Sequence, residues 1–319
     1  MKQVFAYILL ILIIVALVIT AVLFGSSDIS AFTSSDKYIL WNLRLPRTVM
    51  CLLCGSTLAV CGSVFQAVFR NPLCDPYIIG VSSGASLGAT IVIVLGLDTF
   101  LFGLTLGAFI SSLATVFLIM RLSAVGNRLH TTTLLLAGIS INFLFSAIIS
   151  ILMFYDQEDM HKIYFWTMGS LSSITYKDCI TVAAFTIVGS TFLILFAKRL
   201  NVLLLGDLQT NSLGIDAQKT KKIVLIIATL MCSSVVSICG VIGFVGLVCP
   251  HIARLLFGQD NRKILPFSIL LGMIFMLLAD ITARNLFSPS ELPIGTVTSI
   301  VGAPFFIYLL YNAKKKLHF

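Results

Sequence analysis

Ten apolar stretches, each close to the length of a membrane-spanning helix, restrict how this chain of 319 residues can fold. A helix needs about 20 mainly apolar residues to cross the hydrocarbon core of a bilayer. The stretches are 4–24, 48–69, 78–97, 100–120, 132–154, 179–197, 223–242, 243–257, 264–283 and 295–311. The eighth is short and follows the seventh almost without a break, so nine spans is the alternative. With only short loops left over, residues 1–319 are predicted to form one all-α, polytopic transmembrane domain.

The charge content supports a membrane chain. Only 11% of the residues are charged and 58% are hydrophobic, whereas a soluble domain carries roughly a quarter charged residues. A water-soluble enzyme, a soluble nucleic-acid binder and a disordered scaffold are therefore excluded. The first stretch exceeds the apolar core of a signal peptide, and no clean cleavage site follows it. We interpret it as a retained helix.

Basic residues predict the orientation. With ten spans and a cytoplasmic N-terminus, both termini are cytoplasmic and only six of the 21 basic residues lie outside. Those six are Lys37, Arg44, Arg47, Lys162, Lys177 and Arg284. This distribution satisfies the positive-inside rule. The net charge of +8 is thus explained by topology, and nucleic acid is not expected as a partner.

Titratable and metal-binding groups are sparse within the spans. Asp280 lies four residues before Arg284, a spacing that allows a helical ion pair, and we expect this pair rather than a proton relay. The four histidines do not cluster. The eight cysteines lie in or beside apolar stretches, where free cysteine behaves as a small hydrophobe. No disulfide, metal site or catalytic residue is predicted.

Nucleotide-binding and hydrolytic motifs are missing from the sequence. The phosphate-binding loop G-x-x-x-x-G-K-[ST] does not occur, nor do H-E-x-x-H and G-x-S-x-G. We therefore expect no cofactor on this chain, and any ATP hydrolysis must be performed by another polypeptide.

Two local patterns predict contacts. Gly80, Gly84 and Gly88 share one helix face, which favours a tight helix–helix seam over a direct ligand contact. The longest inner loop, 198–222, contains one or two short helical pieces bounded by Gly206 and Gly214. Leu205 and Leu208 share a face there, and this face meets either a docked partner or the membrane surface.

Several motifs together resemble the FecCD-type permease family, the membrane subunits of ABC importers for iron–siderophores, haem and cobalamin. The matching residues run in order and at family spacing from about residue 44 to 310. They include Arg44-Leu-Pro-Arg47, Arg70-Asn-Pro-Leu-Cys-Asp-Pro76, Gly80-Val-Ser-Ser-Gly-Ala85, Trp166-Thr-Met-Gly-Ser170, Gly243-Phe-Val-Gly-Leu-Val-Cys-Pro-His-Ile-Ala-Arg254, Leu278-Ala-Asp280, Glu291-Leu-Pro-Ile-Gly295 and Gly302-Ala-Pro304.

The resemblance implies a type II ABC importer permease fold in a prokaryotic cytoplasmic (inner) membrane. It implies a second permease subunit, identical or related, two ATP-binding cassette subunits that use Mg-ATP, and an extracytoplasmic substrate-binding protein. An iron(III)–siderophore is the expected cargo on family frequency, ahead of haem and cobalamin. The alternative outside the family is an ion-coupled secondary transporter or channel, which would need titratable residues in the spans.

The resemblance also implies three groups of functional residues. The ATPase-docking segment comprises Leu205, Gly206, Asp207, Leu208, Ser212, Leu213 and Gly214. Arg44, Arg47 and Arg284 are expected to contact carboxylates of the binding protein, where the planar guanidinium suits a two-bond contact; anchoring at the headgroups, or pairing of Arg284 with Asp280, is the alternative. The translocation pathway is expected to include Gly138, Asn142, Ser146, Gly302 and Pro304, although Asn142 and Ser146 could instead hydrogen-bond between helices.

Overall fold

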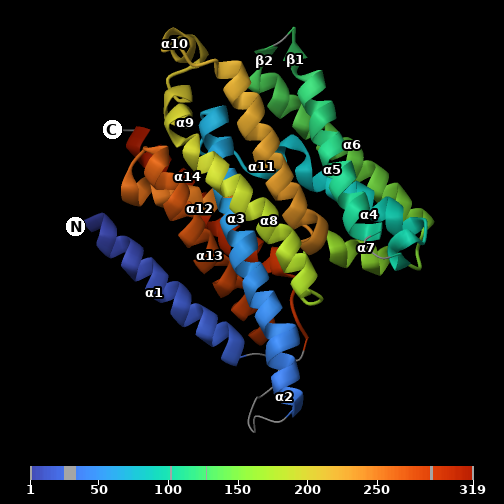
Figure 1. The fold of residues 1–319 in the computed structure, drawn as a ribbon. Coiled ribbons are helices and arrows are strands. Elements are labelled where there is room, and N and C mark those ends of the chain that lie inside the picture. The colour runs from blue at the N-terminus through green and yellow to red at the C-terminus, as the bar shows by residue number, and fades with distance from the viewer. Residues whose placement is uncertain (1, 25–33, 101–102, 127, 288–289, 318–319) are drawn as a thin grey trace.

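The computed structural model describes residues 2–24, 34–100, 103–126, 128–287 and 290–317, which form a helical bundle (Figure 1). Its elements are α1 (Lys2–Leu23), α2 (Ser34–Tyr38), the π-helical turn η1 (Ile39–Arg44), α3 (Leu45–Phe69), the 3-10 helix η2 (Pro76–Ile79), α4 (Val81–Val94), the 3-10 helix η3 (Leu97–Thr99), α5 (Gly103–Leu122), β1 (Ala124–Val125), β2 (Arg128–Leu129), α6 (Thr131–Tyr155), α7 (Met160–Thr167), α8 (Tyr176–Leu195), α9 (Ala197–Leu203), α10 (Asp207–Ser212), α11 (Ala217–Cys239), α12 (Val245–Phe257), α13 (Asn261–Asn285) and α14 (Ile294–Leu317).

The predicted all-α membrane fold is confirmed. Among the described residues, seven helical segments are long and apolar enough to cross a membrane, and α4, α12 and α14 supply three shorter apolar helices. These ten correspond to the ten predicted stretches. The stretch 100–120 includes residues 101–102, which lie outside the described residues, and α5 begins at Gly103.

Two of the ten helices are shorter than a full span; for 243–257 this was expected, whereas for 78–97 it was not. Helix α4 has 14 residues and α12 has 13, so each covers about 20 Å at 1.5 Å per residue, less than the roughly 30 Å hydrocarbon core. The stretch 78–97 is broken at Gly80, whose φ of +81° suits glycine. Gly240, at φ +70°, ends α11, and the chain then runs without helix to Phe244. The separate helices α11 and α12 favour ten stretches over nine.

Helix α3 forms the centre of the bundle, as Figure 1 shows. Every residue from Cys54 to Phe69 is buried, and α3 packs against α13, α12, α8 and α11. Cross-helix hydrogen bonds join it to its neighbours: the Thr57 and Thr186 hydroxyl oxygens lie 2.6 Å apart. Such bonds stabilise helix association where lipid provides no hydrophobic drive.

Glycine allows several helices to approach closely. A Cβ at Gly84 would collide with Thr115 of α5, and one at Gly88 would collide with the Gly107 backbone. The predicted glycine seam is therefore confirmed, with α5 as the partner of α4. A second seam joins α3 and α13, where a side chain on Gly272 would overlap the Gly55 carbonyl.

The two ends of the bundle carry different structures. In Figure 1, α9, α10 and the β1–β2 hairpin lie at one end, and α2 with the start of α3 lies at the other. The hairpin pairs Ala124 with Leu129 in an antiparallel register and turns at Gly126, whose φ is +63°. This arrangement separates the two predicted docking regions.

Candidate docking and translocation sites

The predicted ATPase-docking segment contains one short helix between two glycines. Gly206, at φ +106°, precedes α10, and Gly214, at φ +78°, follows it. L side chains rarely adopt these angles, so glycine is favoured at both turns. The prediction of short helical pieces bounded by Gly206 and Gly214 is confirmed.

The exposed surface of this segment combines three leucines with the polar residues Gln209, Asn211 and Ser212. The side chains of Leu205, Leu208 and Leu213 are exposed, and Leu208 is 84% exposed. The exposed Ser212 donates to the Leu208 carbonyl, whereas the buried Thr210 donates to the Gly206 carbonyl and fixes the helix from within. The exposed leucines suit a protein partner or a membrane surface, so the docking role stays a prediction.

Asp207 points from α10 back toward the bundle. Its carboxylate lies 2.6 Å from the ammonium of Lys221, which is 2% exposed, and it accepts a 2.9 Å bond from the Gln218 amide. The Gln218 carbonyl oxygen in turn accepts from the Leu129 backbone N–H at 2.8 Å. Asp207 therefore holds α10 to α11, and through Gln218 to the hairpin.

Helix α9 is held at the start of α13. Asn201 donates to Asp260 at 2.6 Å and accepts from the backbone and side chain of Asn261. Asp260 caps α13 by accepting from the Arg262 backbone. The Arg262 guanidinium, bonded to the same carboxylate, holds the pKa of Asp260 well below its usual range. The docking segment is thus fixed at both of its flanks.

The three predicted binding-protein arginines lie together near the opposite end, and all three are buried. Arg44 donates to the carbonyls that end α1, those of Val22 and Leu23, at 3.1 and 2.8 Å. Arg284 donates to the nearby Ala21 carbonyl at 3.1 Å. The arginines therefore also tie α1 to α3 and α13.

Asp280 is the centre of this cluster. Its two oxygens lie 2.7 Å from Arg47 Nε and 2.8 Å from Arg284 Nη2, and Arg47 also contacts Glu291 at 2.7 Å. The predicted Asp280–Arg284 pair is confirmed. The Arg47 contact was not predicted, because helical spacing carries no information on residues 233 positions apart. In this conformation these guanidinium groups are occupied within the chain, and their docking role stays a prediction.

The predicted pathway residues of α6 have different environments. Gly138 is buried, and a Cβ there would collide with the Ile78 carbonyl. The Asn142 side chain accepts a hydrogen bond from Ser83 of α4, which is the interhelical alternative. Ser146 is exposed. Thus Ser146 alone of the α6 trio has an exposed side chain.

The pathway residues of α14 lie on another flank of the bundle. Gly302 is buried, and a side chain there would overlap the ring of Phe244. Pro304 is exposed. Phe244 itself has a φ of +68°, rare for a bulky residue. Sequence patterns gave no sign of this strain. Helix α6 packs on α4 and α5 while α14 packs on α13 and α12, and Figure 1 shows them on opposite sides.

The chain is similar in sequence and in fold to known permeases. The sequence pattern of the FecCD transport family matches residues 8–312. The hemin transport permease HmuU of Yersinia pestis is 36% identical over 290 residues, covering 89% of this chain and 86% of that protein. The cobalamin import permease BtuC of Halobacterium salinarum is 38% identical over 274 residues, covering 86% and 73%. A solved inward-facing structure, described as a metal-chelate type ABC transporter, superposes with a TM-score of 0.86 at 32% identity, covering 95% and 97%.

Proposed function

Because the chain belongs to the FecCD transport family, as the permease component of an ABC importer, we propose that its cargo is an iron(III) chelate. Among such chelates, an iron(III)–siderophore complex is the first candidate cargo, followed by haem and cobalamin. Such chelates are too large and polar to cross lipid unaided, so the permease must offer them a gated route. Two relatives are permeases for hemin and cobalamin, which are both bulky metal chelates, and this supports a metal chelate as the class of cargo.

The observation that carries the proposed importer role is the separation of two interaction regions along the bundle. The exposed leucines in and beside α10 lie at one end, and the cluster of Arg44, Arg47 and Arg284 lies near the other. We propose that α10 faces the cytoplasm and meets an ATPase, while the arginine end faces a substrate-binding protein. The 15 basic residues assigned to the cytoplasmic side, among them Lys219 and Lys222, support this orientation.

The proposed assembly contains two copies of the permease, or this chain with a related one, and two ATPase subunits. Helices α6 and α14 lie on opposite sides of one chain. A second permease subunit would place helices of both chains around a shared route, and Ser146 and Pro304 expose side chains for that role.

The proposed transmission of force starts at α10. Movement of a docked ATPase would displace α10, and the Asp207–Lys221 ion pair would transfer that displacement to α11. The Gln218 bridge would carry it to the hairpin that precedes α6. In this scheme the chain is a passive gate, and ATP is hydrolysed by the partner.

Transport by a reconstituted complex tests the function. The permease, its ATPase and its binding protein are assembled in proteoliposomes with ATP enclosed, and uptake of ferric siderophore, hemin and cobalamin is compared. We expect ATP-dependent uptake of the ferric siderophore that requires the binding protein. If only hemin or only cobalamin is taken up, the proposed siderophore cargo is wrong. If the permease without its partners takes up cargo in the absence of ATP, the proposed ATP-driven mechanism is wrong.

A further inference from the structure

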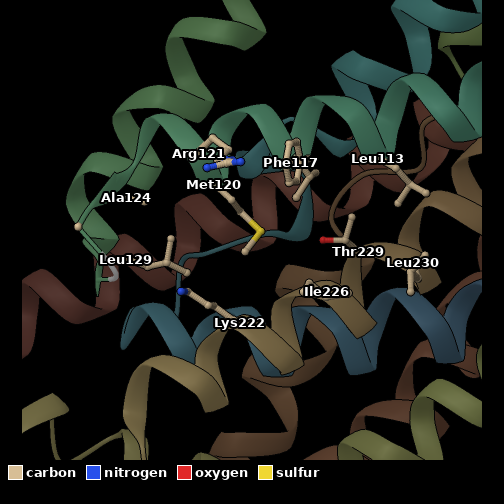
Figure 2. A pocket seen from close by; sticks show the side chains of 12 residues that line it. Leu113, Phe117, Met120, Arg121, Ala124, Leu129, Lys222, Ile226, Thr229 and Leu230 are labelled. Atoms are coloured by element: carbon tan, nitrogen blue, oxygen red, sulfur yellow. The ribbon is translucent and has the colours of Figure 1, made fainter.

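A groove opens on the surface of the bundle between α5 and α11, at the end that carries α10. It has a volume of about 540 Å³ and is lined by the last three turns of α5, the hairpin and the first half of α11. Its volume falls within the range of small-molecule sites. Figure 2 shows Arg121 reaching the groove from α5 and Lys222 from α11. We call it the α5–α11 groove.

The charged residues of the lining lie at one end of the groove, and the rest is mainly apolar, with Thr229 beside Leu230. Arg121 and Lys222 lie at the end near the hairpin, and Leu113 and Leu230 lie at the far end. Each leucine is eight residues from the basic residue on its own helix, or about 12 Å at 1.5 Å per residue. One leaflet of hydrocarbon is about 15 Å thick. A groove of this length with its charged end at the headgroups would extend most of the way to the middle of the bilayer.

The mouth of the groove faces the surroundings of the bundle. Phe117 on α5 is 63% exposed and Ile226 on α11 is 50% exposed. In a membrane, exposed apolar side chains of this kind contact acyl chains. The Arg121 guanidinium lies 5.5 Å from the centre of the Phe117 ring, which keeps the charge at the mouth. Among the described residues that line the groove, none is acidic.

We propose that the α5–α11 groove binds a phospholipid with an anionic headgroup, taken from the leaflet on the α10 side. The phosphate lies between Arg121 and Lys222, and one acyl chain runs along the groove past Phe117 toward Leu113. Basic pockets between transmembrane helices on the cytoplasmic side bind anionic headgroups in this way. None of the predicted pathway residues lines this groove, and lipid here would brace α5 against α11, the helix that holds Asp207.

A neighbouring cavity provides a comparison within the same chain. It has a volume of about 470 Å³ between α8 and α11, and its described lining is wholly apolar. Acyl chains of any phospholipid suit it, because no charged group selects the headgroup there. Selectivity for anionic lipid is thus expected from the α5–α11 groove.

Native mass spectrometry of the full-length chain in mild detergent tests the proposal. Phosphatidylglycerol and phosphatidylcholine with identical acyl chains are titrated, and their affinities are compared. We expect the wild type to bind phosphatidylglycerol at least about tenfold more tightly. Replacing both basic residues, Arg121→Gln with Lys222→Gln, is expected to weaken phosphatidylglycerol binding roughly tenfold to thirtyfold and to leave phosphatidylcholine binding unchanged.

A matched control removes the same charge from the same end of the bundle. Arg199→Gln with Lys219→Gln alters an arginine that also lies beside a phenylalanine and a lysine one turn from Lys222, and neither residue lines the groove. We expect wild-type lipid binding from it. Leu113→Trp, which fills the deep end, should weaken phosphatidylglycerol binding while both charges remain.

Four results would overturn the proposal: equal affinity of the wild type for the two lipids, an unaffected Arg121/Lys222 variant, an equal loss in the control, or displacement of the lipid by inorganic phosphate. The last would identify a free-anion site. If the double variant does not elute as a single species, Lys222→Gln and Lys219→Gln on the same helix are compared alone, and equal affinities would again overturn it.

Discussion

Asp280 shows how strongly one residue can depend on its neighbours. It is fully buried and contacts two guanidinium groups, those of Arg47 and Arg284. Removing one partner from a buried ion pair is costly, because the remaining charge stays buried without compensation. Here two arginines would lose their shared carboxylate at once.

We therefore expect Asp280→Asn to lower the free energy of unfolding by about 3–5 kcal/mol, measured by denaturant or thermal unfolding in detergent. Glu291→Gln is the matched control. Glu291 contacts Arg47 as well, but its side chain is 31% exposed, and an exposed pair contributes about 0–1 kcal/mol. Similar losses in the two variants would show that Asp280 does not organise the cluster.

The Asp207–Lys221 pair leads to a prediction about coupling. Lys221 is buried, so Asp207→Ala leaves its ammonium without a carboxylate. We expect less cargo transported per ATP hydrolysed, by about tenfold, while the partner's hydrolysis continues, as measured in proteoliposomes. Lys219→Met, on an exposed position of the same helix, should leave that ratio unchanged. A wild-type ratio in Asp207→Ala would remove the pair from the transmission scheme.

Helix seams dominate the element scale. The α3–α13 seam depends on the mutual approach of Gly55 and Gly272, where each added Cβ meets the other's carbonyl. Because these contacts involve backbone atoms, neighbouring side chains cannot relieve them by changing rotamer. The seam is therefore expected to tolerate no side chain larger than hydrogen.

We expect Gly272→Ala to destabilise the protein by roughly 1–3 kcal/mol, the usual cost of overpacking. Gly243→Ala is the control, because its added Cβ would meet only Ser299 Oγ, at 3.9 Å. Gly243 also has no positive φ. Thermal unfolding of both variants is measured in one detergent. An unchanged midpoint of unfolding for Gly272→Ala would mean that α3 and α13 can move apart at no cost.

The sequence was sufficient to predict elements whose signal is local. Apolar length identified the ten apolar helices, and glycines four apart predicted a seam on α4 but not that α5 is its partner. It already indicated that 243–257 is short, but it could not show that α4 stops short of a full span, because the break at Gly80 depends on the backbone angle there. The Arg47–Asp280 and Asp207–Lys221 contacts also require folded geometry.

At the scale of the whole molecule, the candidate pathway residues do not converge within one chain. Gly138, Asn142 and Gly302 are engaged in packing or an interhelical hydrogen bond, and α6 and α14 lie on opposite sides. We therefore expect a route that uses the exposed Ser146 to be completed by the proposed second permease subunit.

Two exposed positions on α6 are expected to have different surroundings. Ser146 and Leu144 lie at similar depth, but the 100° advance per residue turns their side chains about 160° apart. In the assembled complex we expect Ser146→Cys to react with a membrane-impermeant thiol reagent at least about tenfold faster than Leu144→Cys, because the proposed route would place Ser146 in water and Leu144 in lipid. The native cysteines are all buried, which keeps the background low. Equal reactivity at both positions would place the aqueous route elsewhere and assign α6 to a lipid-facing role.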